Sequence, residues 1–366
     1  MNINFFAPTK MIIGSGCVLT GGKLLSSLGK RCLIVTGKSS AKASGALDDA
    51  LSVLEEQNIA YDIFDSIRQN PTVSSCKEAG EIAKSINADF ILGIGGGSAL
   101  DAAKAVAVFA ANDLDESGLY SYNWEKAPLP VVCIGTTAGT GSEVTPVSVL
   151  TASDNRKKSI RDDRIYPVLS FGDAKYTASL SDFFTRSCAV DALSHSIESY
   201  FSKSANDVSR MFAIRSCELL LPLLEKGAEN LTSQDRDSLY LASVYAGYAI
   251  SVTGTAFPHA MGYFLSESYD IPHGSACAVF LSDFLLWSQR FAADDAKNFS
   301  IKTGYDIEEV INIVKKTTPT VDIRIADSDI DALYPRWIDN KGLLRSPGSF
   351  LPDDANALLI KLFKHY

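Results

Sequence analysis

The sequence has 366 residues, a formal net charge of −9, 46% hydrophobic residues and 21% charged residues. This composition is typical of a globular protein and excludes a disordered chain, while the acidic balance argues against nucleic acid or an anionic membrane as a partner. The length predicts two domains. Seven scattered cysteines form no C-x-x-C pair, no signal-peptide pattern is visible, and no apolar run approaches a membrane span, so we expect reduced thiols in a cytoplasmic protein.

Strand-like and helix-like segments alternate through the first half of the chain. The short apolar runs predicted as strands are residues 32–36, 61–64, 90–94 and 129–134. Apolar residues at helical spacing lie between them, at residues 45–57, 73–86 and 99–111. This alternation predicts a mainly parallel sheet with helices on both faces.

The pattern changes near residue 178. Beyond that point the strand signals fade, and long segments have the 3.6-residue period of helices. These segments are residues 182–201, 207–225, 236–252 and 276–290. We therefore predict an α/β domain over residues 1–178 and an all-helical domain over residues 179–366.

Two glycine-rich loops follow predicted strands of the first domain. In residues 95–98, Gly-Gly-Gly-Ser opens a helix, whose free N–H groups and positive dipole end can hold a pyrophosphate. The segment lacks the G-x-G-x-x-G pattern of the standard dinucleotide fold. Residues 135–145, dense in threonine and glycine, follow the next strand, where open α/β sheets bind ligands. The pair predicts a shared dinucleotide crevice, and the alternative is two ordinary tight turns.

One carboxylate and three of the four histidines form a candidate metal site. Asp191 and His195 are four residues apart on a predicted helix, so they share one face, and His259 and His273 follow. These groups suit a divalent ion such as Fe²⁺ or Zn²⁺. A lone histidine in an apolar helix is more often a hydrogen-bonded core residue, so both interpretations stay open on spacing alone. Glu198 lies on the same helix face, either behind the ligands or in a surface salt bridge.

Together these segments resemble the iron-containing (group III) alcohol dehydrogenase family, which has the dehydroquinate-synthase-like fold. The matching motifs are G-G-G-S-x-x-D-x-A-K at residues 95–104, T-T-A-G-T-G-S-E at 136–143, D-A-x-x-H-x-x-E at 191–198, and the H-A-M-G and P-H-G-x-A segments around His259 and His273. They occur in the family's order over nearly the whole chain. The resemblance implies a homodimeric enzyme that transfers hydride between a nicotinamide cofactor and a small alcohol or aldehyde.

The resemblance also implies roles for individual residues. The metal ligands match Asp191, His195, His259 and His273. The cofactor-binding positions match Gly95, Gly96, Gly97, Ser98, Asp101, Thr136, Thr137, Thr140 and Ser142. A family lysine near the cofactor ribose matches Lys157, although Lys158 is close enough to leave this register open.

The segment after the first predicted strand departs from the family pattern. Many members carry an acidic residue there, which binds a ribose 2′-hydroxyl. Here the residues are Gly37, Lys38 and Ser39. A lysine and hydroxyls in place of a carboxylate suit a 2′-phosphate, so we predict NADP(H) over NAD(H), with aldehyde reduction as the working direction.

Tyr263 is a second departure. Many members have a histidine at this position, four residues after the ligand that matches His259, and that histidine is often assigned to proton relay. Tyrosine has an ordinary pKa of about 10, which makes it a poor base at neutral pH. We expect Tyr263 either to line the substrate pocket or to serve in the relay.

Three alternatives remain at this point. A glycerol-dehydrogenase-like or phosphonoacetaldehyde-reductase-like enzyme would share the chemistry and differ in substrate. Dehydroquinate synthase would need basic side chains near His259 and His273, where the stretch is apolar and acidic. A non-catalytic nucleotide-binding protein would use a closed, structural metal site.

Overall fold

The computed structural model describes residues 3–319, 321 and 323–363. The chain divides into two compact units. The α/β unit contains Phe6–Ser181 and Asn230–Ser251, and the helical unit contains Met1–Phe5, Asp182–Glu229 and Val252–Tyr366. None of the helices in the described ranges is both long enough and apolar enough to span a membrane.

A six-stranded, wholly parallel sheet forms the centre of the α/β unit, in the order β1-β8-β5-β4-β2-β3. The strands are β1 (Lys10–Ile13), β2 (Arg31–Thr36), β3 (Ala60–Phe64), β4 (Phe90–Gly95), β5 (Val131–Gly135) and β8 (Leu169–Gly172). A separate antiparallel pair consists of β6 (Val147–Thr151) and β7 (Lys157–Arg161). The predicted parallel sheet is confirmed, and β2 to β5 lie where the sequence places its strands.

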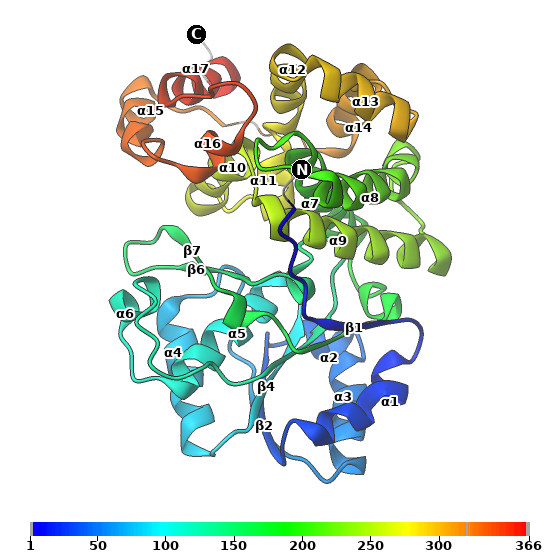
Figure 1. The fold of residues 1–366 in the computed structure, drawn as a ribbon, viewed down its shortest axis with the longest axis vertical. Coiled ribbons are helices and arrows are strands. Elements are labelled where there is room, and N and C mark those ends of the chain that lie inside the picture. The colour runs from blue at the N-terminus through cyan, green and yellow to red at the C-terminus, as the bar shows by residue number, and fades with distance from the viewer. Residues whose placement is uncertain (1–2, 320, 322, 364–366) are drawn as a thin grey trace. The chain divides into compact units, whose positions relative to one another are not determined.

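Helices cover both faces of this sheet, as Figure 1 shows with α4 and α5 on one side and α1 and α3 on the other. Alternate residues of each strand point to opposite faces. In β2, Leu33 and Val35 pack with α4 (Val73–Ser85) and α5 (Gly97–Ala111). Cys32 and Ile34 of the same strand pack with residues of α1 and α3. The remaining helices of this part are α1 (Cys17–Gly21), α2 (Ser40–Ala43), α3 (Ala46–Glu56) and α6 (Glu116–Tyr120).

Three strands end in register at one edge of the sheet. Thr36 of β2 pairs with Ile94 of β4, and Gly95 of β4 pairs with Gly135 of β5. The segments that follow these strands therefore leave the sheet side by side. This register brings together the three loops in which the sequence places its cofactor-binding residues.

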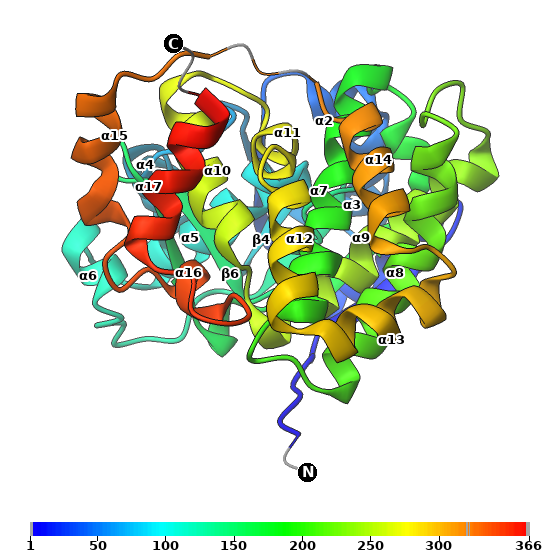
Figure 2. The ribbon, with the colours of Figure 1, turned by 90° about the horizontal axis from the view of Figure 1, so that it is seen from above.

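Within the described residues, all regular secondary structure of the helical unit is helical. The long ones are α7 (Asp182–Phe201), α8 (Asp207–Glu225), α10 (Phe257–Ser268), α12 (Leu281–Phe291), α13 (Ala293–Thr303), α14 (Ile307–Thr317) and α17 (Pro352–Phe363). The shorter ones are α11 (His273–Ala278), α15 (Asp327–Leu333) and α16 (Lys341–Arg345). Viewed as in Figure 2, α12 lies beside α14 and α7, with which it packs.

The segment predicted as one helix over residues 276–290 is two helices, α11 and α12. The chain turns tightly between them, where the Phe280 N–H donates to the Cys277 carbonyl three residues earlier. Buried apolar residues lie on both sides of the turn, at Ala276–Ala278 and at Leu281, Phe284 and Leu285, so the apolar period runs through it without a gap. Periodicity alone therefore could not reveal this break.

Helix α9 (Ser233–Thr253) groups mainly with the α/β unit, although the sequence-based division at residue 178 places it in the helical domain. The contact is very close, because a Cβ on Gly247 would lie 2.7 Å from the Gly141 carbonyl oxygen. The Arg236 guanidinium also donates to the Thr177 carbonyl at 2.9 Å. The chain thus returns once to the α/β unit before completing the helical unit.

Candidate metal centre and cofactor loops

Three helices of the helical unit supply the candidate metal ligands. Asp191 and His195 lie on α7, His259 lies on α10, and His273 is the first residue of α11. Glycine lets these helices approach closely: a Cβ on Gly274 would lie 2.0 Å from the Ser187 carbonyl oxygen of α7. A larger residue there would push α11 away from α7.

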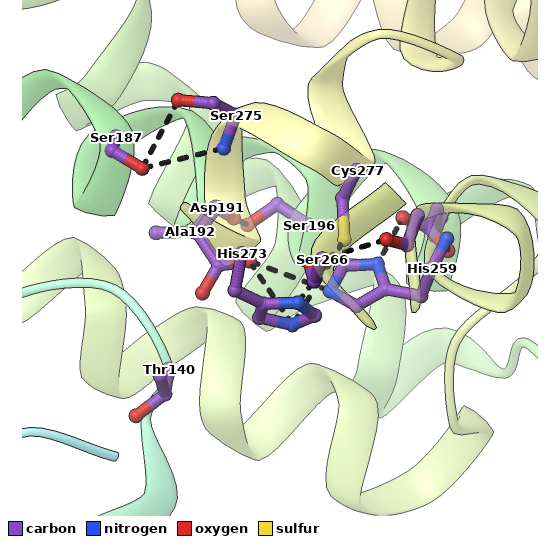
Figure 3. A network of polar contacts seen from close by, with 12 residues as sticks. Thr140, Ser187, Asp191, Ala192, Ser196, His259, Ser266, His273, Ser275 and Cys277 are labelled. Carbon is purple, nitrogen blue, oxygen red and sulfur yellow. Dashed lines mark hydrogen bonds and ion pairs between the residues drawn. The ribbon is translucent and has the colours of Figure 1, made fainter. Parts of the chain in front are cut away.

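The structure brings three of the four predicted ligands to one point. Asp191 Oδ1 lies 3.4 Å from His259 Nε2 and 3.9 Å from His273 Nε2. The donor atoms of Asp191, His259, His273 and Cys277 all lie within 4.8 Å of one another. Figure 3 shows these side chains converging from α7, α10 and α11. The Asp191 and His259 side chains are almost fully buried, whereas the His273 side chain is 27% exposed.

His195, the fourth predicted ligand, lies next to this cluster but outside the set of four. Its ring stacks on the His259 ring, with centroids 4.4 Å apart and planes 20° apart. The spacing of Asp191 and His195 on one helix turn thus places the imidazole against the cluster. The structure does not bring its nitrogen atoms into the four-donor set.

Two buried donor atoms of the cluster lack hydrogen bonds to any described residue: Asp191 Oδ1 and His259 Nε2. Such atoms are costly to bury without a partner. Burial raises the pKa of Asp191, but His195, His273 and His259 outweigh it and hold this pKa below its ordinary value. A carboxylate oxygen and imidazole nitrogens left to face one another are the donors that a divalent metal requires, so the residues fit such an ion.

Glu198 holds His259 in place. One carboxylate oxygen lies 2.5 Å from His259 Nδ1, and the other accepts the Ala256 N–H at 2.6 Å. The carboxylate is fully buried, so it is not in a surface salt bridge. By accepting a hydrogen bond from Nδ1–H, Glu198 keeps the proton on Nδ1 and leaves the lone pair of His259 Nε2 facing Asp191.

Replacing Glu198 by glutamine is expected to weaken metal binding about 10–100-fold. Glutamine has one acceptor oxygen, so its amide N–H₂ group must face either His259 Nδ1–H or the Ala256 N–H. A competition titration of Zn²⁺ against a chromophoric chelator measures the change. Glu218→Gln is the matched control, because Glu218 is an exposed carboxylate paired with Arg215. Equal affinities for wild type and Glu198→Gln would refute the role of this carboxylate.

In the α/β unit the two glycine-rich loops touch each other. A Cβ on Gly96 would lie 2.8 Å from the Thr137 side chain, and one on Gly97 would lie 2.6 Å from the Thr140 side chain. Thr136 follows β5 directly, and its N–H donates to the Gly95 carbonyl. Ser98 lies in the first turn of α5.

Asp101 and Ser142, both predicted to face the cofactor, tie α5 to the second loop. Ser142 Oγ donates to Asp101 Oδ1 at 2.5 Å, and Asp101 Oδ2 accepts the Val149 N–H at 2.9 Å. Lys104 is fully buried beneath them and donates to the Ser142 carbonyl and hydroxyl, both at 2.7 Å, and to the Val147 carbonyl at 2.8 Å. Burial lowers the pKa of Lys104 and raises that of Asp101. Asp101, Lys104 and Ser142 therefore fix the conformation of the second loop through these hydrogen bonds.

The remaining predicted site residues lie on the surface of their units. Lys38 and Ser39 are exposed immediately after β2, and Gly37 is partly buried beside them. Lys157 begins β7, and Lys158 pairs with Asp154 at 2.9 Å.

Tyr263 stacks on the His273 ring, with centroids 5.5 Å apart and planes 24° apart. It therefore lies against the most exposed ligand of the metal cluster.

Cys277 is the member of the cluster that sequence reasoning missed. It follows His273 by four residues, the spacing that puts two side chains on one helix face. The same signal led to Asp191 and His195. Applied to every histidine, it would have identified Cys277 as well.

Two family models match this chain. Residues 8–174 match the model described as iron-containing alcohol dehydrogenase. Residues 185–331 match the model described as Fe-containing alcohol dehydrogenase family, C-terminal. The two matches cover most of the chain and include every predicted site residue.

Individual relatives agree with these matches. Alcohol dehydrogenase 4 of Schizosaccharomyces pombe is 31% identical over 347 residues, which cover 90% of this chain and 82% of the relative. An NAD-dependent methanol dehydrogenase of Bacillus methanolicus is 33% identical over 75% of this chain and 73% of its own length. The crystal structure of an iron-containing alcohol dehydrogenase from Thermotoga maritima superposes with a TM-score of 0.91, at 34% identity, over 98% of this chain and 99% of that one.

Proposed function

Because this chain belongs to the iron-containing alcohol dehydrogenase family, we propose that it transfers hydride between NADP(H) and a small alcohol or aldehyde. The observation that carries the proposal is the convergence of Asp191, His259 and His273, two of whose buried donor atoms have no hydrogen-bond partner among the described residues. The family match supports the reaction type, and the cluster supports a metal-assisted version of it.

Asp191, His195, His259 and His273 would hold the metal, either Fe²⁺ or Zn²⁺. When bound, such an ion polarises the carbon–oxygen bond of the substrate as a Lewis acid. Glu198 keeps His259 in the tautomer protonated at Nδ1, so that the Nε2 lone pair is available to the metal. Tyr263, stacked on His273, supplies an aromatic wall beside the most exposed ligand and offers a hydroxyl to the substrate.

The cofactor would lie along the loops that leave the carboxyl edge of the parallel sheet. The N–H groups at the start of α5, a helix of 15 residues, are suited to the pyrophosphate. Lys104 of the same helix fixes the position of the neighbouring threonine- and glycine-rich loop, because it donates a hydrogen bond to the Ser142 carbonyl. Lys38 and Ser39, exposed after β2, are suited to a 2′-phosphate. The protein thus supplies orientation and electrostatics, while the cofactor carries the hydride.

We expect a higher kcat/KM with NADPH than with NADH, by about tenfold or more. This magnitude follows from one charge-assisted hydrogen bond to the 2′-phosphate, worth about 1.5–3 kcal/mol. The assay is the loss of reduced-cofactor absorbance with a panel of short aldehydes. Lys38→Ala should lower the NADPH value and spare the NADH value, whereas Lys42→Ala, at an exposed lysine on α2, should change neither.

A strong NADH preference would refute the cofactor assignment and leave the metal assignment standing. The Bacillus methanolicus relative is NAD-dependent by name, so this comparison separates two real possibilities. The aldehyde panel also tests the reaction itself. If no alcohol or aldehyde is turned over by the metal-loaded protein with either cofactor, a nucleotide-binding protein with a structural metal becomes the better account.

A further inference from the structure

We propose that Cys277 supplies a sulfur ligand to the same metal, so that the site combines oxygen, nitrogen and sulfur donors. This inference rests on the proposed function, because it concerns the ion that the aspartate and histidines would hold. It adds a ligand, and with it a preference for one class of metal.

The thiol is aimed at the cluster by the helix that carries it. His273 and Cys277 are four residues apart on α11 and share one face of it. Cys277 Sγ lies 3.7 Å from His273 Nδ1 and 3.9 Å from His273 Nε2. Gly262 of α10 packs against the cysteine from behind, where a Cβ would lie 2.8 Å from Sγ. Figure 3 shows the sulfur directed toward the histidine rings.

The four donor atoms lie within 4.8 Å of one another, close enough for one ion to draw them into a coordination sphere. Bonds of about 2.0–2.1 Å to nitrogen or oxygen and about 2.3 Å to sulfur place neighbouring ligand atoms about 2.9–3.6 Å apart, whether the ion has four ligands or more. The observed separations are 3.4 Å for Asp191 Oδ1 to His259 Nε2, and 3.9 Å from His273 Nε2 to both Asp191 Oδ1 and Cys277 Sγ. For these three pairs, an ion would need to draw the donors together by about 1 Å or less.

A packing role alone accounts for Cys277 less well. Cys76, a typical core cysteine of this chain, lies within an apolar cluster between α4 and α5. Cys277 is equally buried, but its sulfur faces imidazole nitrogens. Asp191 Oδ1 and His259 Nε2, the two buried atoms without hydrogen bonds to described residues, lie within 4.8 Å of it. A thiol is too weak a donor to satisfy them, whereas a shared cation would satisfy all three.

A thiolate ligand changes which metal the site prefers. On binding, the sulfur–hydrogen bond breaks, the proton passes to solvent, and the sulfur lone pair forms the bond to the metal, with no change of oxidation state. Thiolate is a soft ligand and favours Zn²⁺ over harder ions. We therefore expect this chain to discriminate for Zn²⁺ against Fe²⁺ more strongly than an otherwise identical site without sulfur.

The test is the absorption spectrum of the full-length protein loaded with Co²⁺ in place of its metal, without cofactor or substrate. Wild type should show the near-ultraviolet thiolate-to-cobalt charge-transfer band, and Cys277→Ser should lose it while keeping the visible cobalt bands. Cys277→Ser should also bind Zn²⁺ at least about tenfold more weakly. Cys188→Ser is the control, because Cys188 lies one helix turn before Asp191 but outside the four-donor set. It should keep both the band and the affinity.

Each possible result either supports or refutes a sulfur ligand from Cys277. A wild-type cobalt protein with visible bands and no charge-transfer band refutes the sulfur ligand and leaves the proposed function intact. A band that survives in Cys277→Ser refutes it as well. If wild type binds no Co²⁺ at all, the proposed metal site fails together with the inference. Should Cys277→Ser not fold, X-ray absorption of the wild-type zinc protein replaces it, and a sulfur neighbour at about 2.3 Å is the expected result.

Discussion

Replacing His273 by alanine is expected to remove the bound metal and the dehydrogenase activity together, while the protein remains folded. His273 is the most exposed of the converging ligands and begins a six-residue helix, so its loss opens no cavity in a large core. The loss of one of a small set of ligands should reduce metal occupancy below detection at micromolar protein. The expected fall in kcat/KM exceeds a thousandfold, since the metal supplies several kcal/mol of transition-state stabilisation.

Metal content by elemental analysis and aldehyde-dependent NADPH oxidation measure these two losses on one preparation. Circular dichroism and NADPH binding report whether the units are still folded. Tyr269→Ala is the control, because it truncates an exposed aromatic side chain four residues before His273. It should retain both metal and activity. Full activity in His273→Ala would remove this residue from the account.

Replacing Lys104 by methionine is expected to destabilise the α/β unit by about 3–5 kcal/mol. The substitution keeps much of the side-chain volume but removes the buried ammonium. The Ser142 and Val147 carbonyls then lose their donor, and the buried Asp101 carboxyl group loses the cation beside it. Cofactor binding should fall as well, because the loop that Lys104 holds is the one that contains Thr140 and Ser142.

Thermal or urea unfolding measures the stability change, and fluorescence titration with NADPH measures the binding. Lys84→Met is the matched control, because Lys84 is an exposed lysine paired with Glu81 at 2.8 Å, and such pairs contribute about 1 kcal/mol or less. Unfolding transitions at the same denaturant concentration for wild type and Lys104→Met would show that the buried network contributes nothing.

The parts of the fold that follow from the sequence are those with a continuous local signal. β4 and β5 are buried along their whole length, so they appear as unbroken apolar runs. Helices α7 and α8 begin and end at the predicted residues, because the flanking segments interrupt the helical period. β1 and β8 were not predicted. Each has only four residues, and β1 is an edge strand with exposed ends, so its apolar pattern is too short to detect.

The association of α9 with the α/β unit could not be predicted for a different reason. Its apolar residues have the same period as those of α8 and α10, and period does not say which unit a face packs against. The decisive feature is the close approach of Gly247 to Gly141. A single glycine in a helical pattern is compatible with such a close approach, but the sequence does not indicate which segment packs against it.

In the candidate site too, local spacing predicts some features, whereas others depend on contacts that only the structure shows. The i, i+4 spacing of Asp191 and His195 follows from helix geometry. The spacing of the histidines predicts that His259 and His273 join them but leaves a core role open, and the family resemblance implies the full set. Glu198 could be placed on the right face, but only the structure shows its carboxylate against His259 Nδ1. The spacing of four residues after His273 puts Cys277 on the same helix face, but only the structure shows that its thiol faces imidazole nitrogens.

We propose that a single divalent ion at Asp191 and the histidines is required for hydride transfer. It is tested most directly by stripping the wild-type protein with a chelator and returning Fe²⁺ or Zn²⁺ anaerobically, while bound metal and aldehyde-dependent NADPH oxidation are followed together. We predict that the stripped chain is inactive and that activity rises in proportion to bound metal until each chain holds one ion. A stripped chain that keeps its activity, or a chain that fills with metal and stays inactive with every aldehyde and alcohol, would contradict the account.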